Sequence, residues 1–359
     1  MEPTLAEAAA TPARGHLSVA RLERQWFIAC RSGELKGQPL SRRIQGTPVV
    51  VFRTGKGAAA ALLDRCPHRN VPLSEGQVRG EELECRYHGW RFDCAGECVA
   101  IPGLVSGETR LRSRRAPSFA VREVDGYLWV FSTPEVTPTT EPFRFPHLDD
   151  ARFTHARREF RVAAHMHAVL ENTLDVPHTA FLHGGYFRTA QKENEIEVVV
   201  RRTSDRVEAE YLNEPRPKGL AGRLLAPRGG VVTHFDRFLL PCVAQVEYRL
   251  GESSHLVTTS AHTPVDDFDT RVYVVVSLRL PLPGWLVKPF VTPIATHIFK
   301  QDAQILRQQT ETIRAFGGER YATTEIDVLG PQIWRLLRHA SREDAPPLPD
   351  EETRVRMRT

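Results

Sequence analysis

Two short motifs, Cys66-Pro67-His68 and Cys85-Arg86-Tyr87-His88, constrain this chain more than any other feature. Each motif offers one thiolate and one imidazole, and 16 residues separate the two motifs. Two cysteines and two histidines can together bind a metal, and both donor types suit zinc as well as iron. A structural zinc site is therefore one possibility, although zinc modules normally space the ligands of both pairs by two to four residues. Cys94 and Cys98 form a nearby C-x-x-x-C pair, for which packed or exposed free thiols are the ordinary interpretation.

The spacing of the two motifs resembles that of a Rieske centre more closely than that of a zinc site. A Rieske centre is a two-iron, two-sulfide cluster in which cysteines ligate one iron and histidines ligate the other. Each loop must therefore supply one sulfur and one nitrogen, as both motifs do here. The likeness continues into Gly89-Trp90, and we expect Tyr87 and Trp90 to pack over the cluster. The resemblance implies a [2Fe–2S] cluster with four protein ligands, namely Cys66, His68, Cys85 and His88.

The size of the chain and its charge narrow the class of protein. A chain of 359 residues, 41% hydrophobic and 26% charged, is long enough for two globular domains. The formal charge of +4 is small, but arginines cluster around the metal motifs and at residues 110–115. A solvated basic surface is the ordinary interpretation, and a docking patch for an acidic electron-carrier protein is the more specific one. Nucleic acid is not favoured as a partner, because no binding module accompanies the arginines.

Cysteine content and apolar segments bear on the compartment. Six cysteines, two of them assigned to iron, imply no disulfide framework and favour a reducing compartment. Residues 1–20 lack the apolar core of a signal peptide, and we expect them to form a flexible leader. The most apolar stretch, Leu280–Phe299, is interrupted by Lys288 and four prolines, so it should not cross a bilayer. We therefore predict a cytoplasmic protein without a transmembrane segment.

Periodicity and turn residues predict an α+β fold with two domains. Between Trp26 and Phe131, short apolar runs alternate with glycine-containing turns, which indicates a small all-β domain that carries the metal motifs on its loops. Residues 133–146 contain four prolines and are expected to form a linker. The second domain should resemble a helix-grip fold, with an antiparallel sheet and a long C-terminal helix. The predicted parts are a leader (1–20), a Rieske domain (21–132), a linker (133–146), a catalytic domain (147–339) and a solvated tail (340–359).

The second domain contains two predicted helical segments and several predicted strands. Val162–Phe181 has polar and apolar residues at near-helical spacing, and Val291–Phe316 is predicted to be a long helix that ends at Gly317-Gly318. Strands are predicted at Ile196–Val200, Val207–Leu212, Val231–Leu240, Ala244–Leu250, His255–His262 and Arg271–Leu280.

A second candidate metal site follows the first predicted helix. His178 and His183 are five residues apart, so a helix that loosens near its end could turn both imidazoles toward one point. Such a pair is more often structural. However, a non-heme iron(II) that activates oxygen requires two histidines and one carboxylate with open coordination positions beside them. Asp302 on the long late helix offers that carboxylate.

The order of these residues resembles the catalytic-domain signature of the Rieske non-heme iron oxygenases. The pattern Asn-x-x-Asp-x-x-His-x-x-Phe-x-His, from Asn172 to His183, lies downstream of the cysteine–histidine motifs, and Asp302 matches the family's third iron ligand in order and context. The resemblance covers about residues 20–310 and is strongest to the single-subunit monooxygenase and O-demethylase branch. That branch includes vanillate demethylase-like, aminopyrrolnitrin oxygenase-like and ketosteroid hydroxylase-like enzymes.

The same resemblance implies a role for Asp175 and an oligomeric state. The matching aspartate in the family lies between a cluster-ligating histidine of one subunit and an iron-ligating histidine of the next. Asp175 would thus connect His88 of a neighbouring copy to His178, and such a bridge fixes the tautomers of both rings. A ring of head-to-tail subunits is required, so the resemblance implies a homotrimer. A local hydrogen bond is the alternative role for Asp175, and Asn172 is expected either beside the iron or as a helix cap.

The predicted function is that of an oxygenase component that receives electrons from a ferredoxin or flavin reductase. No G-x-G-x-x-G fingerprint follows a strand, so NAD(P)H should act only indirectly, through a separate reductase. Stretches with few charges, at Leu182–Phe187, Val231–Leu280 and Gly284–Ile298, favour an apolar aromatic, terpenoid or steroid-like substrate. Hydroxylation or demethylation by O2 is expected. The alternatives are cis-dihydroxylation, N-oxygenation, or a non-catalytic Rieske electron-transfer protein with a ligand-binding domain.

Overall fold

The computed structural model describes residues 17–183, 194–215, 232–251, 254–281, 284–342 and 345–358. The chain divides into two compact units. The first, which we call the β unit, contains residues 21–146 and 261–266. The second, the helix–sheet unit, contains the described residues of the remaining chain. No helix in the described ranges combines the length and the apolar character needed to cross a bilayer.

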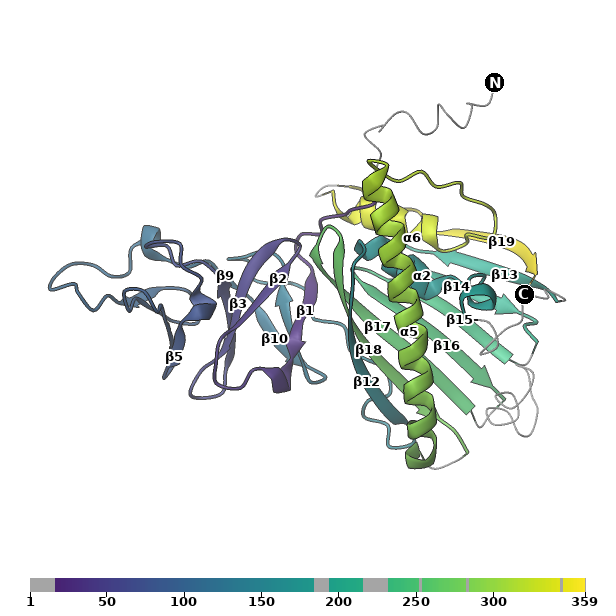
Figure 1. Ribbon diagram of the computed structural model, residues 1–359, viewed down its shortest axis with the longest axis horizontal. Helices are drawn as coiled ribbons and strands as arrows, with labels where there is room; N and C mark the ends of the chain where they lie inside the picture. The colour runs from purple at the N-terminus through teal and green to yellow at the C-terminus, as the bar shows by residue number, and fades with distance from the viewer. Residues whose placement is uncertain are drawn as a thin grey trace, which may run out of the picture. The chain divides into compact units, whose positions relative to one another are not determined.

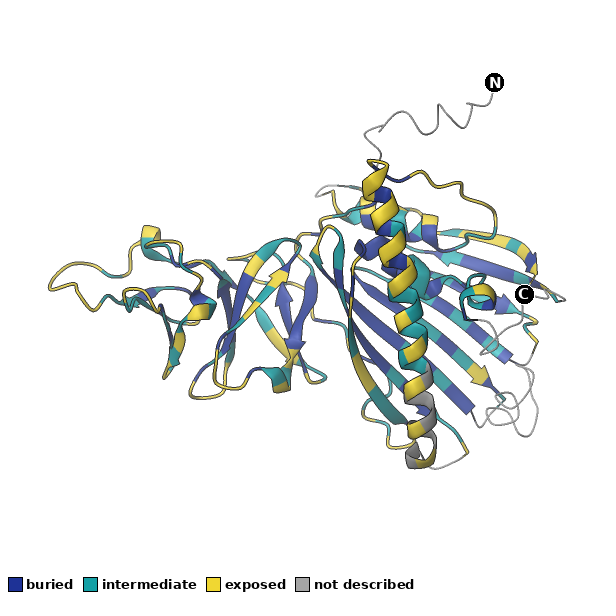
Figure 2. Ribbon diagram, viewed as in Figure 1, coloured by how far each residue is buried: buried dark blue, intermediate teal, exposed yellow. Residues whose placement is uncertain are grey.

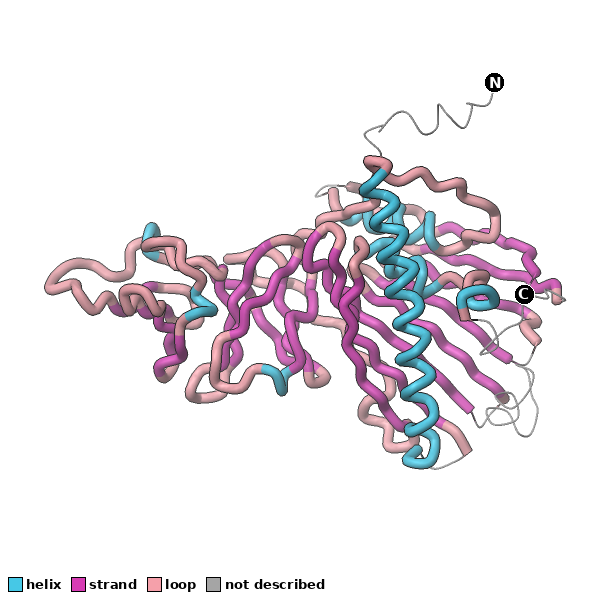
Figure 3. The backbone as a smooth tube through the Cα atoms, in the orientation of Figure 1, coloured by secondary structure: helices cyan, strands magenta, loops and turns pink. Residues whose placement is uncertain are grey.

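The β unit consists of three small sheets (Figures 1 and 3). Their strand orders are β1-β11-β10, β2-β3-β4-β9 and β5-β6-β7-β8, and neighbouring strands run antiparallel. The first sheet comprises β1 (Trp26–Arg31), β10 (Val121–Val124) and β11 (Tyr127–Phe131). The second comprises β2 (Leu40–Ile44), β3 (Thr47–Arg53), β4 (Ala59–Leu63) and β9 (Ser118–Phe119). The third comprises β5 (Gln77–Arg79), β6 (Glu82–Glu84), β7 (Arg91–Phe92) and β8 (Cys98–Ala100).

Continuous apolar runs form the buried strands of this unit. Strand β11 is buried at all five positions and β1 at its first five, because apolar side chains cover both faces of their sheet. The hairpin expected around Thr54-Gly55-Lys56-Gly57 is confirmed by the pairing of β3 with β4. Three short 3₁₀ turns complete the unit, at Ser32–Glu34 (η1), Leu73–Glu75 (η2) and Arg112–Arg114 (η3).

The helix–sheet unit is built on one eight-stranded sheet with the order β12-β18-β17-β16-β15-β14-β13-β19. Its strands are β12 (Thr154–Val162), β13 (Glu195–Arg202), β14 (Arg206–Leu212), β15 (Val232–Leu239), β16 (Val243–Leu250), β17 (Ser254–Asp266), β18 (Asp269–Arg279) and β19 (Glu351–Arg358). Its helices are α2 (Met166–Leu174), α3 (Thr179–Leu182), α5 (Gly284–Ala315) and α6 (Gly330–Ala340). The helices cover one face of the sheet (Figure 1). The predicted α+β class is therefore confirmed.

The helices are held on the sheet by an apolar core. Ala168 and Val169 of α2 and Leu306 of α5 pack with Val272 and Val274 of β18. The inner side of the described part of α5 is therefore covered, while its outer side is exposed (Figure 2). A helix with one covered and one exposed side is the usual amphipathic arrangement at a protein surface.

Helix α5 starts earlier than the sequence predicted. We expected it to begin at Val291, but it begins at Gly284 and includes Pro289 and Pro293. Proline usually breaks a helix because it lacks an N–H donor and crowds the preceding turn. The two prolines are four residues apart and exposed, so they share the solvent-facing side, where water can bind the carbonyl groups they leave unpaired. The first predicted helix, Val162–Phe181, also differs from the prediction, because two separate helices, α2 and α3, lie in this region.

Residues 351–358 form a strand, β19, which corrects our expectation of a solvated tail for this part of residues 340–359. Strand β19 pairs antiparallel with β13 along its whole length, with Val355 opposite Val198 and Met357 opposite Ile196. Buried Arg202 of β13 also binds Glu351 of β19 at 2.5 Å. Backbone pairing with an otherwise uncovered edge strand thus outweighs the charged composition of this segment.

Replacing Glu351 by alanine should destabilise the helix–sheet unit by about 2 kcal/mol, because the buried guanidinium of Arg202 would lose its carboxylate partner. Urea unfolding measures this change. Glu352→Ala is the matched control, since Glu352 pairs with exposed Arg201 and should contribute less than about 0.5 kcal/mol. Equal effects of the two substitutions would contradict the assignment of a buried ion pair.

Part of the predicted flexible leader is also fixed. Residues 1–16 lie outside the described residues, but Ser18 is buried and anchored. Its backbone N–H and its hydroxyl both donate to the carboxylate of Glu319, at 2.8 and 2.6 Å. A serine that forms two hydrogen bonds to a buried carboxylate leaves little freedom to the residues beside it.

Candidate metal centres

The two cysteine–histidine motifs lie on loops of the β unit, the first after β4 and the second between β6 and β7. Both cysteine side chains are buried, with 2% and 3% of their surface exposed. Backbone hydrogen bonds close each loop around its cysteine, from Asn70 N–H to the Cys66 carbonyl at 2.8 Å and from Gly89 N–H to the Cys85 carbonyl at 3.0 Å. Gly89 adopts φ +69°, a conformation that glycine reaches without strain.

The two imidazoles of these loops meet beside the thiols. The ring centroids of His68 and His88 are 4.5 Å apart, and the indole of Trp90 stacks on His68 at 4.7 Å. Tyr87 contacts His88, with ring centroids 4.0 Å apart, yet 61% of Tyr87 is exposed. Trp90 therefore covers one side of the group as expected, whereas Tyr87 lies at the surface.

The donor arrangement fits two metal ions better than one. Burial raises the pKa of the Cys66 thiol to about 11, and the adjacent Cys85 contributes in the same direction. A bound metal ion would replace the proton of the Cys66 thiol, because thiolates are the form that binds metals. Among the described residues, one group of three or more possible metal-ligand atoms lies within 4.8 Å of one another, and that group contains none of Cys66, His68, Cys85 and His88. A single tetrahedral zinc ion would require all four donors to be that close.

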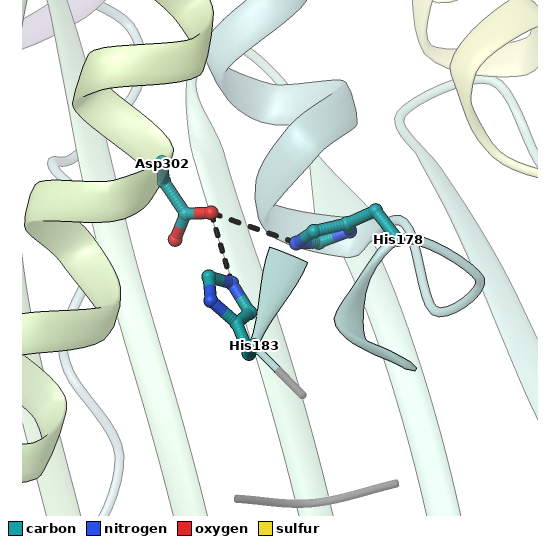
Figure 4. Close-up of side chains that lie close together, drawn as sticks. All are labelled: His178, His183 and Asp302. Carbon is teal, nitrogen blue, oxygen red and sulfur yellow. Dashed lines mark ion pairs between the residues drawn. The ribbon is translucent and has the colours of Figure 1, made fainter. Parts of the chain in front are cut away.

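The second candidate centre lies in the helix–sheet unit, where three predicted ligands converge (Figure 4). His178 precedes α3, His183 follows it, and Asp302 extends from α5. The Oδ1 atom of Asp302 lies 3.0 Å from Nε2 of His183 and 3.6 Å from Nε2 of His178. These three side chains form the one group within 4.8 Å noted above. Two imidazoles and one carboxylate are the donor set of a mononuclear non-heme iron site.

Neighbouring side chains orient both imidazoles. Nδ1 of His183 lies 3.0 Å from Oε1 of Gln301, and Nδ1 of His178 lies 3.3 Å from Oδ2 of Asp175. If Nδ1 donates its proton in both rings, the two Nε2 atoms are left as acceptors that face Asp302. Gln301 had no signal in the sequence, because a glutamine beside an aspartate on a helix has no distinctive spacing.

The electrostatics of His178 reflect the two carboxylates beside it. Burial alone would lower the pKa of His178, but the hydrogen bonds to Asp175 and Asp302 outweigh burial and raise this pKa to about 9. The negative charge around the ring thus attracts a cation, whether that cation is a proton or a metal ion.

A cavity of about 620 Å³ lies beside His178. Among the residues that the structure describes, its walls are largely apolar and include the carboxylates of Glu171, Asp175 and Asp327 but no lysine or arginine. Burial, followed by the nearby charges of Asp175 and Asp327, raises the pKa of Glu171 to about 7. Asp175, whose side chain is 33% exposed, thus lies between His178 and an acidic cavity.

The structure also contains a buried polar cluster that the sequence did not predict. His234 of β15 lies between Glu214 and Asp236, at 2.7 and 3.0 Å. Its ring is stacked between Tyr211 and Tyr248, which are its partners on the neighbouring strands. Burial lowers the pKa of His234, but the two carboxylates outweigh burial and raise it to about 9. The two stacking contacts require three strands to align, and the pair with Glu214 requires β14 to lie beside β15, which sequence order alone does not reveal.

Other residues named in the sequence analysis are placed as follows. Asn172 lines the cavity beside His178, and its backbone carbonyl accepts the N–H of Asp175 at 3.4 Å. Cys94 is exposed and Cys98 is buried. Of the predicted pocket wall Leu182–Phe187, residues 184–187 lie outside the described residues.

Comparison with known proteins shows which family this chain resembles in sequence. A model described as the Rieske [2Fe-2S] domain matches residues 25–120, and one described as the vanillate O-demethylase oxygenase C-terminal domain matches residues 162–343. The vanillate O-demethylase oxygenase subunit of a Pseudomonas species is 28% identical over 341 residues, which are 89% of this chain and 88% of that protein. Protein TIC 55 of Arabidopsis thaliana, a chloroplast protein, is 29% identical over 77% of this chain, and the match spans 51% of TIC 55.

Solved structures show the same fold. Dicamba monooxygenase bound to dicamba superposes with a TM-score of 0.75 at 22% sequence identity, covering 90% of this chain and 98% of that one. The two family models match the two separate parts of the chain that carry the two candidate centres. The chain therefore belongs to the Rieske oxygenases that combine a Rieske [2Fe-2S] domain with a vanillate O-demethylase-type C-terminal domain.

Proposed function

We propose that this chain is the oxygenase component of a multicomponent system that hydroxylates or demethylates an apolar organic substrate with O2. The convergence of His178, His183 and Asp302 carries the proposal, because a protein that only relays electrons needs no second metal site. Family membership supports it from a separate direction.

In this proposal, two sets of residues hold the metals. Cys66, His68, Cys85 and His88 hold the [2Fe–2S] cluster, and His178, His183 and Asp302 hold a mononuclear iron(II). When bound, the cluster stores single electrons and the mononuclear iron activates O2 beside the substrate. The fit rests on the paired buried thiols in the first set and on the preoriented Nε2 atoms in the second.

The protein's own groups prepare the second site. Gln301 and Asp175 hold the two rings in place through Nδ1, so both Nε2 atoms can bind metal without a change of tautomer. His183 is 2% exposed, which keeps water from competing for this side of the site. Asp302 supplies the negative charge that offsets part of the charge of a divalent ion.

The proposed reaction is monooxygenation. Demethylation of a methyl ether would consume one O2, two electrons and two protons, and would release the hydroxyl product, formaldehyde and water. Several relatives are named as O-demethylases or monooxygenases. A search with aryl methyl ethers, terpenoids and sterols, a surrogate reductase and an oxygen electrode would test the proposal. Failure of every substrate to stimulate oxygen uptake by protein loaded with both metals would contradict it, and a cis-diol product would indicate dihydroxylation instead.

We also propose that the working unit is a homotrimer in which Asp175 accepts a hydrogen bond from His88 of the next copy. The acidic cavity beside Asp175 and the exposed Tyr87 and Arg69 near His88 have complementary charge and apolar character. Contacts between two different surfaces of one chain close into a ring when the rotation permits. Light scattering should give three times the chain mass of 40.5 kDa. A particle of one chain at micromolar concentration would contradict the ring.

The electron source and the compartment complete the proposal. We expect a ferredoxin or flavin reductase to supply electrons, with NAD(P)H acting only through that protein.

The cytoplasm is the proposed compartment, supported by six cysteines without a disulfide. Fractionation of the source cells tests it, and recovery in an organelle, as the name of the chloroplast relative implies for that protein, would contradict it.

A further inference from the structure

One loop of the β unit combines exposed apolar side chains with unpaired positive charge. Residues 102–112, which we call the arginine loop, follow β8, and ten of these eleven residues are exposed, the exception being Thr109 (Figure 2). Val105 is fully exposed, and Leu104 and Leu111 are 37% and 41% exposed. Among the described residues of the β unit, the only other large exposed hydrophobic side chain is Tyr87. Apolar groups gathered at one end of a unit mark an interaction surface.

Two arginines of this loop have no carboxylate partner among the described residues. Arg110 and Arg112 are exposed and form no ion pair, whereas Arg79, Arg86 and Arg91 nearby are each paired with a glutamate. The sole acidic residue of the loop, Glu108, accepts the backbone N–H of Arg110 at 3.1 Å. Positive charge without a local partner is available to a negatively charged protein.

The base of the loop is fixed to the rest of the unit. The guanidinium of Arg115 binds Glu97 at 2.9 Å and Glu135 at 2.8 Å, and it also donates to the carbonyl of Ala95. Arg114 donates to the carbonyl of Glu108. These contacts tie the C-terminal end of the arginine loop to the rest of the unit, which lowers part of the entropy cost of binding a partner there.

The arginine loop also begins beside the cluster ligands. Ile101 and Trp90 pack against the core that contains Cys66 and Cys85. Pro102 lies against Gly89, the residue after His88, so closely that a Cβ at Gly89 would come within 3.0 Å of the proline ring. A protein seated on this loop would therefore be near the second ligand loop.

We infer that the arginine loop is the docking surface for an acidic one-electron carrier protein. Carboxylates of the carrier would pair with Arg110 and Arg112, and its apolar rim would cover Leu104 and Val105. One electron passes from the reduced carrier to the oxidised cluster, and the carrier leaves oxidised. The inference rests on the proposed function for the cluster. It assigns the carrier a surface separate from His88, which the proposed ring places against Asp175 of another copy.

A small surface of this kind suits a partner that must dissociate after each transfer. Electron-transfer complexes have small interfaces, and charge complementarity accelerates their formation by about 10- to 1,000-fold at low salt. A second copy of the chain would instead require a larger and more permanent contact.

The test measures binding of a plant-type [2Fe–2S] ferredoxin, an acidic carrier, to the metal-loaded chain by isothermal titration calorimetry. R110E/R112E should raise the Kd at least about tenfold at low ionic strength, and the difference should shrink near 0.5 M salt because screening weakens the charge pairs. L104S/V105S should raise the Kd without changing its salt dependence. The matched control R24E/R144E removes two exposed arginines outside the loop and should change the Kd less than about twofold.

Three results would overturn the inference. The first is that the unaltered chain shows no measurable binding. The second is that R110E/R112E and R24E/R144E raise the Kd equally. The third is that R65E/R69E raises the Kd more than R110E/R112E does, which would move the docking surface to the first ligand loop. Reduction of the cluster by dithionite should be the same in all variants, which shows that the cluster is intact. Binding that depends on the arginine loop in a protein that makes no product would refute the oxygenase function and leave the docking surface standing.

Discussion

Replacing His183 by alanine should lower product formation by more than about a hundredfold and leave the visible spectrum of the cluster unchanged. Loss of an outer-shell partner alone typically costs 10- to 100-fold in metal affinity or activity, so loss of a direct ligand should cost more. The cluster should survive because its four proposed ligands belong to the β unit, whereas His183 belongs to the helix–sheet unit.

The His183 experiment needs a control and a structural check. His339→Ala is the matched control, because this histidine lies on α6 of the same unit and does not line the cavity. Circular dichroism should show that both variants are folded, and metal analysis of His183→Ala should show loss of the mononuclear iron alone. Retention of that iron, or of product formation, would mean that His183 is a structural histidine. A pure electron carrier would be indifferent to either substitution.

Replacing Asp175 by asparagine should slow electron transfer between the two centres by about 10- to 100-fold while both centres remain loaded. An asparagine has nearly the same shape, but its amide has one acceptor oxygen in place of two. The NH2 group that replaces the other oxygen is a donor, so an asparagine cannot accept N–H groups from His178 and His88 at its two separate terminal atoms, as the carboxylate can. Mixing the reduced, substrate-bound protein with O2 and following oxidation of the cluster would measure the rate in a single turnover.

Glu171→Gln separates the proposed bridge from the charge of the cavity. Glu171 lies on α2, four residues before Asp175, and both residues line the cavity beside His178. In the described structure no hydrogen bond joins Glu171 to His178. This control should keep the rate within a few-fold of the unaltered protein. A normal rate in Asp175→Asn would refute the bridge, and equal slowing in both variants would attribute the effect to lost negative charge.

Residues that carry chemistry were easier to predict than the contacts that position them. Cysteine and histidine have few roles at such close spacing, so the two ligand motifs were visible in the sequence, and family resemblance added Asp302, 119 residues after His183. Gln301 was not predictable, because its contact with His183 exists only once α5 crosses the sheet. The contact of His234 with Glu214 is of the same kind, since it depends on the pairing of β14 with β15.

Errors in the fold came from local propensity that tertiary structure overrides. The segment from Glu351 to Arg358 is rich in charge and resembles a solvated tail, yet the edge of β13 offers it a complete backbone ladder. Val355 and Met357 show the alternation of a strand, but a signal of two residues is weak without its partner. The predicted start of α5 at Val291 was also too late, since sequence alone does not show that Pro289 lies on the exposed side of a continuing helix.

Iron and acid-labile sulfide analysis of the fully loaded protein tests the central claim most directly. Two distinct centres predict about three irons and two sulfides per chain, two irons from the cluster and one from the mononuclear site. His183→Ala should then contain about two irons with unchanged sulfide. Zinc without sulfide, or two irons in the unaltered protein under conditions that saturate both centres, would contradict the account.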